Sequence, residues 1–381
     1  MKKFQVLATA LAAAAFLVGC GGNEGGNQSP RVAFTQMVNF GDSLSDVGSY
    51  NVGVVALQGG GHYSINGQGA TGLLYTNWTE FLAGTLQIAQ PCAAETGLDS
   101  VAPYVPVPGA PATFHDASTG GTCTSYAQGG ARVTVPIGPG NKALLNPADP
   151  STYSNAIGQL TVPVVTQVAN YLAHYNGTFT STQLVTVLAG GNDIFINVAT
   201  FQAKVAAGVP VAQAAGETVQ AMADAGTQLG ALVNTQIVAK GATHVVVVNL
   251  PDVSLTPYAI ANPTAQPLIK QMAVAFNSSL SASLTAGSSV LLVDAFTASE
   301  DQATNMAQYG LTNVSDAACG TTNSLVCTKS KLIAAVAPAA SAAPATAANS
   351  YEYADTVHPT PYGYRLLAEL VGEQMAIKGW L

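Results

Sequence analysis

Short apolar runs alternate along the chain with longer segments in which apolar residues recur at helical spacing. The short runs have the length of buried strands, and several of them end at Gly, Pro or Asp. We therefore expect strands at 32–40, 184–189, 244–250 and 290–293. The longer segments predict helices at 211–240, 265–284 and 361–377, the last with Pro at its start. Alternation of this kind favours an α/β architecture with a parallel sheet.

Two regions interrupt the alternation. Residues 50–155 are rich in Gly, Pro and Thr, and we expect long loops there that pass over the top of the sheet. Residues 297–349 end in an Ala/Pro tract at 334–348 that is typical of a surface loop. Because no linker divides the chain after residue 30, we expect one domain over 31–381 with long loop insertions.

The first thirty residues have a different pattern. Lys2 and Lys3 precede an apolar run at 6–18, which is too short to span a bilayer and is typical of a signal peptide at 1–19. The run ends at Gly19-Cys20 and resembles a bacterial lipobox, which predicts a lipid on Cys20 and a flexible tether over 20–30. We then expect an exported outer-membrane lipoprotein, on the periplasmic or surface face. An ordinary signal peptide that contains a cysteine would give a secreted protein instead.

Composition narrows the range of partners. Hydrophobic residues make up 48% of the chain and charged residues only 8%, against about a quarter charged in typical globular proteins. The formal net charge is −8, with 12 Lys and Arg in 381 residues. Without a basic stripe to bind phosphates, a nucleic acid is not an expected partner.

The cysteines also fit export. Cys20 aside, four remain, and an even number in an exported protein indicates disulfides, although four buried thiols are the alternative. Pairing cannot be deduced from sequence. Short loops are the simplest arrangement, which would join Cys92 to Cys123 and Cys319 to Cys327. We expect no metal site, since no zinc-binding motif occurs and the five histidines are scattered.

A serine lies in a tight turn directly after the first predicted strand. The sequence there is Phe40-Gly41-Asp42-Ser43-Leu44-Ser45-Asp46. Ligands of α/β proteins bind at the carboxyl ends of parallel strands, so Ser43 is a candidate nucleophile. A turn in which Asp42 or Ser43 caps the next helix would have the same pattern.

A serine nucleophile needs a base beside it and a third group that orients the base. The segment Asp355-Thr356-Val357-His358-Pro359 offers both, just before the last predicted helix. Asp355 can accept a hydrogen bond from Nδ1 of His358, which leaves Nε2 to face Ser43. The alternative is a capped turn that carries an exposed histidine.

Two glycine-containing turns could stabilise the negative oxygen that forms when a serine attacks an ester. They lie at 125–131 and 190–193. The first offers a backbone N–H, and the second offers the side-chain amide of Asn192. We expect Asp193 to hold its own loop by hydrogen bonds. Both segments could also be ordinary glycine turns.

Taken in this order, the blocks resemble those of the GDSL (SGNH) esterases and lipases. The likeness runs from Phe40 to the last predicted helix, and the segment 250–257 resembles a strand end found in the bacterial lipase/lysophospholipase branch. The resemblance implies a flavodoxin-like three-layer α/β/α sandwich with a central parallel sheet. The matching blocks are Gly41-Asp42-Ser43-Leu44, a segment that ends at Gly130, Gly191-Asn192-Asp193, and Asp355-x-x-His358.

The resemblance also implies a role for each residue. The expected reaction is hydrolysis of acyl or lipid esters through an acyl-enzyme, with no metal or organic cofactor. Gly129 stays an alternative to its neighbour Gly130. The implied roles are Ser43 as nucleophile, His358 as base, Asp355 as its orienting group, and the Ser43 N–H, the Gly130 N–H and the Asn192 amide as oxyanion donors.

Several alternatives stay open, because the same triad serves them. They are acyl transfer to alcohols, deacetylation of polysaccharides and peptide hydrolysis. A fourth is a non-catalytic surface lipoprotein that binds glycans or partners on an esterase scaffold. The complete set of site residues argues against the last. The sequence gives neither the acyl chain length nor the oligomeric state.

Overall fold

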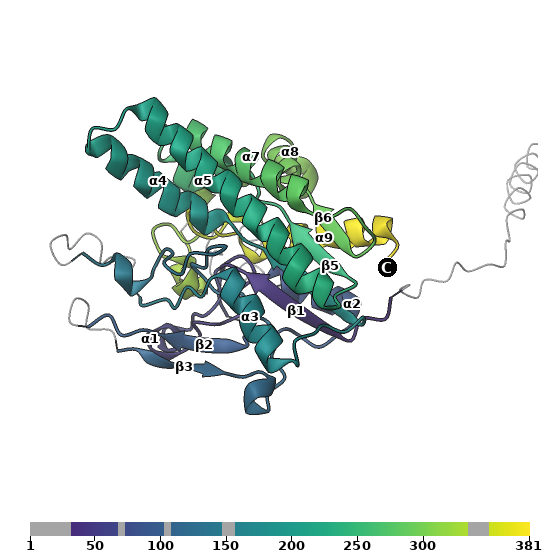
Figure 1. Ribbon diagram of the computed structural model, residues 1–381. Coiled ribbons are helices and arrows are strands. Elements are labelled where there is room, and N and C mark those ends of the chain that lie inside the picture. Colours follow the sequence, from purple (N-terminus) through teal and green to yellow (C-terminus); the bar gives the residue numbers. More distant parts are fainter. Residues whose placement is uncertain (1–31, 68–72, 103–107, 147–156, 334–349) are drawn as a thin grey trace, which may run out of the picture.

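A four-stranded parallel sheet forms the centre of the molecule. The computed structural model describes residues 32–67, 73–102, 108–146, 157–333 and 350–381 (Figure 1). The sheet has the strand order β1-β4-β5-β6, and every neighbouring pair is parallel. Its strands are β1 (Gln36–Gly41), β4 (Gln183–Leu188), β5 (Val245–Val248) and β6 (Val290–Val293).

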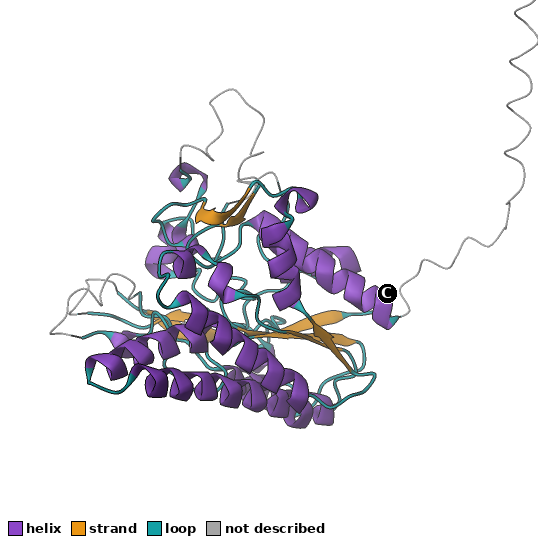
Figure 2. Cartoon of the chain, turned by 90° about the horizontal axis from the view of Figure 1, so that it is seen from above, coloured by secondary structure: helices purple, strands orange, loops and turns teal. Residues whose placement is uncertain are grey.

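Helices cover both faces of this sheet, and Figure 2 shows the strands between the two helical layers. Side chains alternate between the faces along each strand, so each strand contributes to two hydrophobic clusters. One face packs against α3 (Val164–His174), α4 (Gly191–Ala206), α5 (Val211–Leu232) and α7 (Gln266–Ser283). The other face packs against α2 (Trp78–Leu86) and α9 (Pro361–Lys378). The fold is therefore an α/β/α sandwich.

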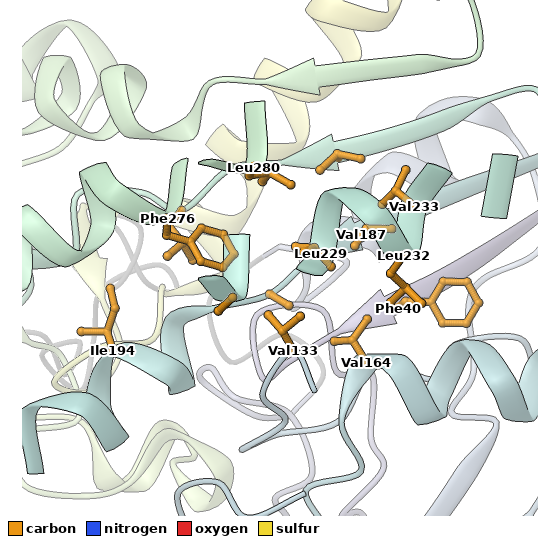
Figure 3. Packing of buried hydrophobic residues seen from close by; sticks show 14 of the residues in the cluster. Phe40, Val133, Val164, Val187, Ile194, Leu229, Leu232, Val233, Phe276 and Leu280 are labelled. Atoms are coloured by element: carbon orange, nitrogen blue, oxygen red, sulfur yellow. The ribbon is translucent and has the colours of Figure 1, made fainter. Parts of the chain in front are cut away.

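The larger cluster lies under α3, α4, α5 and α7. Phe40 of β1 and Val187 of β4 belong to it together with Val164, Leu229 and Phe276, all of them buried (Figure 3). On the opposite face, Val246 and Val248 of β5 join the second cluster. Because strands buried on both faces are mostly apolar, the Val-rich runs in the sequence mark these strands.

A loop segment continues the sheet at the outer edge of β1. Asn39 N–H donates to Thr124 O, Tyr126 N–H to Asn39 O, and Gln128 N–H to Gly41 O. Asn39 and Ser125 form a parallel bridge. The segment that ends in Gly129-Gly130 thus runs beside β1 in the same direction, and both turn at the same edge of the sheet.

The two regions expected to be loops contain short elements. Residues 50–155 hold α1 (Gly53–Leu57), α2 and the hairpin β2 (Glu95–Leu98) with β3 (Ala110–Phe114). Helix α2 packs against one face of the sheet, so this region does more than pass over its top. The second region, 297–349, holds most of α8 (Ala295–Thr304) and β7 (Asn313–Ala317), which pairs in parallel with β8 (Tyr351–Tyr353) just after it. The short helix α6 (Pro257–Ile260) lies before this region.

The predicted elements agree with the structure in kind and differ mostly at their ends. Strand β6 and the starts of α5 and α9 lie where they were predicted. The helical run from 211 continues to Lys240, but α geometry stops at Leu232 and gives way to a π-turn and a 3₁₀ turn. Thr360 caps α9 by accepting a hydrogen bond from the Gly363 N–H, and Pro361 occupies the first turn.

Both expected disulfides are present. Cys92 pairs with Cys123, and Cys319 with Cys327. The predicted signal peptide, Cys20 and its tether, as well as the Ala/Pro tract, lie outside the described residues. Within the described ranges, no helix is both long and apolar enough to cross a membrane.

Candidate active site

Ser43 lies directly after β1, at the carboxyl edge of the sheet. Gly41 brings the chain so close to β4 that a Cβ on it would come within 2.2 Å of Leu188 O. Its φ of +154° also favours glycine. The Asp42 N–H donates to Leu188 O at 3.2 Å, and the Leu44 N–H to Asp42 Oδ1 at 3.0 Å. These contacts hold the turn that carries Ser43, whose exposed fraction is only 7%.

His358 connects Ser43 to Asp355. Its Nε2 lies 2.9 Å from Ser43 Oγ, and its Nδ1 lies 2.9 Å from both carboxylate oxygens of Asp355. A neutral imidazole with its proton on Nδ1 therefore donates to Asp355 and presents the lone pair of Nε2 to the serine. This is the arrangement in which a histidine can accept a proton from a serine hydroxyl.

Asp355 is held by its own loop and by a disulfide-closed loop. Its Oδ1 accepts hydrogen bonds from the N–H groups of Val357 and His358, and its Oδ2 accepts one from Ser324 at 2.9 Å. Ser324 lies between Cys319 and Cys327, which are joined. Burial alone would raise the pKa of Asp355. The adjacent His358 and these hydrogen bonds outweigh it and hold that pKa well below its usual range.

The candidate oxyanion donors differ in what they bind. The Gly129 N–H donates to Asp46 Oδ2 at 2.8 Å and is therefore engaged. In the described part of the chain, the N–H groups of Ser43 and Gly130 have no hydrogen-bond acceptor. The geometry thus favours Gly130 over Gly129 as donor. Gly130 needs its positive φ of 76°, and a Cβ there would lie 2.3 Å from Pro139 O.

Asn192 and Asp193 begin α4, directly after β4. Asn192 Nδ2 donates to Ala131 O at 2.8 Å, so its amide lies beside the Gly130 turn with a second N–H available. From the sequence we expected Asp193 to hold only its own loop, but it also contacts the segment that follows Gly130. Its carboxylate accepts hydrogen bonds from Arg132 Nε and the Val133 N–H at 2.8 and 3.1 Å. These contacts join the turn before α4 to the turn that contains Gly130.

Asp46 is a site residue to which sequence reasoning gave no role. It is fully buried and accepts hydrogen bonds from the N–H groups of Gly48, Ser49 and Gly129 and from the Ser49 hydroxyl. Burial raises its pKa, and these bonds oppose the rise. Asp46 ties the Ser43 turn to the Gly130 turn. Its place three residues after Ser43 was the only available hint.

Tyr63 is another residue that no pattern indicated. Its ring lies over the imidazole of His358, with 4.8 Å between ring centroids. The Tyr364 hydroxyl of α9 donates to Tyr63 O, and the Ser64 hydroxyl to Pro359 O. The insertion therefore supports the histidine through packing.

A cleft opens beside Ser43 and His358. It encloses about 1120 Å³ of empty space, its open mouth included. Asp42 and Asn192 also line it, whereas Gly130 is not among its lining residues. Burial raises the pKa of Asp42 to about 7. The apolar lining extends from the sheet edge to α8 and α9 and includes Leu188, Phe195, Leu250, Val253, Ala298, Ala303, Leu367 and Leu370.

The described residues contain no group of three His, Cys, Asp or Glu side chains arranged to hold a metal ion. Comparison with known proteins identifies a family. The family model of GDSL-like lipases and acylhydrolases matches residues 37–371. The chain belongs to this family. A search of curated proteins gives no match.

Membership in the GDSL-like family fits the geometry on two counts. Acylhydrolases act on esters, and a serine in contact with a histidine–aspartate pair is suited to acyl transfer. The central parallel sheet between helical layers agrees with the sandwich expected for the family. The chain is therefore a hydrolase of ester bonds in the general sense of its family.

Proposed function

We propose that this protein hydrolyses carboxylic esters of apolar acyl chains through a covalent intermediate on Ser43. The observation that carries the proposal is the continuous contact from Ser43 Oγ to His358 Nε2 and from Nδ1 to Asp355. The apolar cleft beside Ser43 supports an acyl chain as the group it binds, since pockets for such ligands are concave and mostly apolar.

In the first step, His358 Nε2 takes the proton as Ser43 Oγ attacks the ester carbonyl. The N–H groups of Ser43 and Gly130 and the amide of Asn192 stabilise the negative oxygen. His358 then gives the proton to the leaving alcohol. Asp355 keeps the imidazole in the required tautomer and stabilises its charged form. Water attacks the acyl-enzyme by the same route and releases the acid.

The substrates we favour are lipid esters, as in the bacterial lipase/lysophospholipase branch that the segment 250–257 resembles. A lipid on Cys20 would place the enzyme at the outer membrane, near such esters. This part of the proposal has its own test. Metabolic labelling with palmitate should mark the wild type and not Cys20→Ser, and the variant should leave the membrane fraction. An unlabelled wild type with the same fractionation as the variant would contradict the anchor.

The test of the reaction is hydrolysis of p-nitrophenyl butyrate and p-nitrophenyl octanoate by the mature protein. Ser43→Ala and His358→Ala should each lose activity on both esters, while circular dichroism shows an unchanged fold. Equal activity in wild type and Ser43→Ala would contradict the proposal. p-Nitroanilide peptides, assayed in parallel, separate an esterase from a peptidase.

A further inference from the structure

One carboxyl group in the cleft has no function in the proposed reaction. Glu352 of β8 lines the cleft. Its Oε2 is buried without a hydrogen-bond partner, and no hydrogen bond opposes the effect of burial on the pKa of its carboxyl group. The backbone of Glu352 is held independently, because its carbonyl accepts a hydrogen bond from the Thr360 N–H at 2.8 Å. The strand position of Glu352 is thus set by its backbone, while Oε2 of its side chain lacks a partner.

Glu352 differs in this from the other carboxyl groups of the cleft. Asp42 accepts a hydrogen bond from the Leu44 N–H, and Asp252 binds the Ser254 N–H and lies 2.9 Å from Lys270 Nζ. A buried polar group without a partner costs free energy, so it is uncommon in folded proteins unless a ligand or water binds it. Because Glu352 lines the cleft, a ligand that enters the cleft can supply a hydrogen-bond partner to its carboxyl group.

The chemistry around Glu352 restricts what that group can be. Among the described residues that line the cleft there is no Lys or Arg, and most of the lining is apolar, which disfavours a phosphate or a free carboxylate as the ligand. Burial raises the pKa of Glu352 to about 7. The carboxyl is then largely neutral at mildly acid pH and can both donate and accept a hydrogen bond. A neutral hydroxyl matches this pair and is far less costly to desolvate than an ammonium group.

We infer that the cleft takes an acyl chain that carries a hydroxyl group, and that Glu352 binds this hydroxyl. The inference rests on the proposed function and specifies its substrate class. An unsubstituted chain leaves Glu352 unsatisfied in the complex, whereas a hydroxylated chain satisfies it. Selectivity arises because the plain chain leaves a buried polar group unpaired.

The experiment compares p-nitrophenyl octanoate with its 3-, 6- and 8-hydroxy derivatives. In the wild type, at least one hydroxylated ester should have a kcat/KM about three- to tenfold above that of octanoate, the effect of one hydrogen bond. Glu352→Gln keeps a donor and an acceptor and should retain this preference. Glu352→Met should lose the preference and hydrolyse plain octanoate with a lower KM. Glu369→Met removes an exposed carboxylate of α9 outside the cleft and should keep the wild-type preference.

The inference is overturned if no hydroxylated ester is preferred, or if the preference persists in Glu352→Met. Activity on plain octanoate that depends on Ser43 would leave the proposed function standing in either case. If no ester is hydrolysed, calorimetric binding of 1-octanol and of 1,3-, 1,6- and 1,8-octanediol to the wild type and Glu352→Met decides separately. A diol that binds more tightly than octanol only when Glu352 is present supports the inference, and equal affinities overturn it.

Discussion

The two halves of the candidate active site are built in different ways. Ser43, Gly130 and Asn192 follow three adjacent segments of the central sheet, and main-chain hydrogen bonds between those segments set their positions. Asp355 and His358 lie in a loop that is positioned by local hydrogen bonds, by Tyr63 and by the loop between Cys319 and Cys327. The sheet half is thus fixed by the fold as a whole, and the loop half by a few replaceable contacts.

The difference indicates where each kind of change should act. A substitution in the sheet half that leaves the backbone intact should affect transition-state stabilisation alone. A substitution in the loop half should affect how accurately His358 faces Ser43, with little effect on the rest of the fold. The predictions below test this contrast.

The largest effect should come from the loop half. Asp355→Asn can no longer hold the Nδ1 proton of His358, so the histidine adopts the wrong tautomer and kcat should fall by about 10⁴-fold. Steady-state kinetics with p-nitrophenyl butyrate would measure it. Asp316→Asn, an exposed aspartate of β7, is the matched control and should keep full activity. A decrease of less than tenfold in Asp355→Asn would contradict the role of Asp355.

A smaller loss is expected in the sheet half. Asn192→Ala removes one oxyanion donor and should lower kcat by about 10²–10³-fold, with little change in KM. Asn197→Ala, on the same helix, removes a buried amide that contacts Met222 Sδ. It should reduce thermal stability and leave kcat nearly intact. If both variants lost the same activity, the effect of Asn192 would be structural.

The two disulfides separate stability from activity. Replacing both Cys319 and Cys327 by Ala should cost about 2.5 kcal/mol of unfolding free energy, and loss of the Cys92–Cys123 bridge, which closes a longer loop, about 3.5 kcal/mol. The loss of activity should follow the opposite order, with the larger loss on removal of the Cys319–Cys327 bridge. Only the first change loosens the Ser324 contact to Asp355, and a displaced Asp355 should lower kcat about ten- to a hundredfold. Urea unfolding and kinetics on both variants provide the comparison, and equal kcat values would contradict it.

The last prediction concerns the pH dependence of stability and leaves the catalytic residues untouched. Glu352 has a pKa of about 7 in the folded protein against an ordinary value of 4.5. Its contribution to stability is therefore complete below pH 4.5 and is lost as the pH rises to about 7. Glu352→Gln avoids this loss, so the variant should gain up to about 3 kcal/mol relative to the wild type between pH 4.5 and 8. Unfolding curves at both pH values measure it. A difference between the two proteins that does not change with pH would contradict the raised pKa.

The parts predicted from sequence were those with local patterns. Mostly apolar runs marked the strands, because a sheet covered on both faces buries nearly every side chain. Two buried exceptions, Asn39 and Thr186, are hydrogen-bonded to each other. The pair Asp355 and His358 could be proposed from its spacing, since both atoms of the contact lie in one short loop. The disulfide between Cys319 and Cys327 could be proposed for the same reason, because the two cysteines are close in sequence.

Contacts between residues that lie far apart in the chain could not be predicted from the sequence. Nothing in 124–128 showed that it runs beside β1, because its pairing partner lies more than eighty residues earlier. Glu352 occupies a polar position in a short edge strand, where a glutamate is usually exposed, and only the packing of α8 and α9 brings it to a cleft. Helix α2 had a capping box of Asn77 and Glu80 that a closer look at the insertion would have found.

The central claim is that Ser43 forms a covalent acyl-enzyme with the help of His358. Labelling the wild-type protein with an alkyl fluorophosphonate, followed by digestion and mass spectrometry, tests it most directly. The account predicts one adduct, on the peptide that contains Ser43, and a labelling rate that falls sharply in His358→Ala. An adduct on another residue, or undiminished labelling in Ser43→Ala, would contradict it.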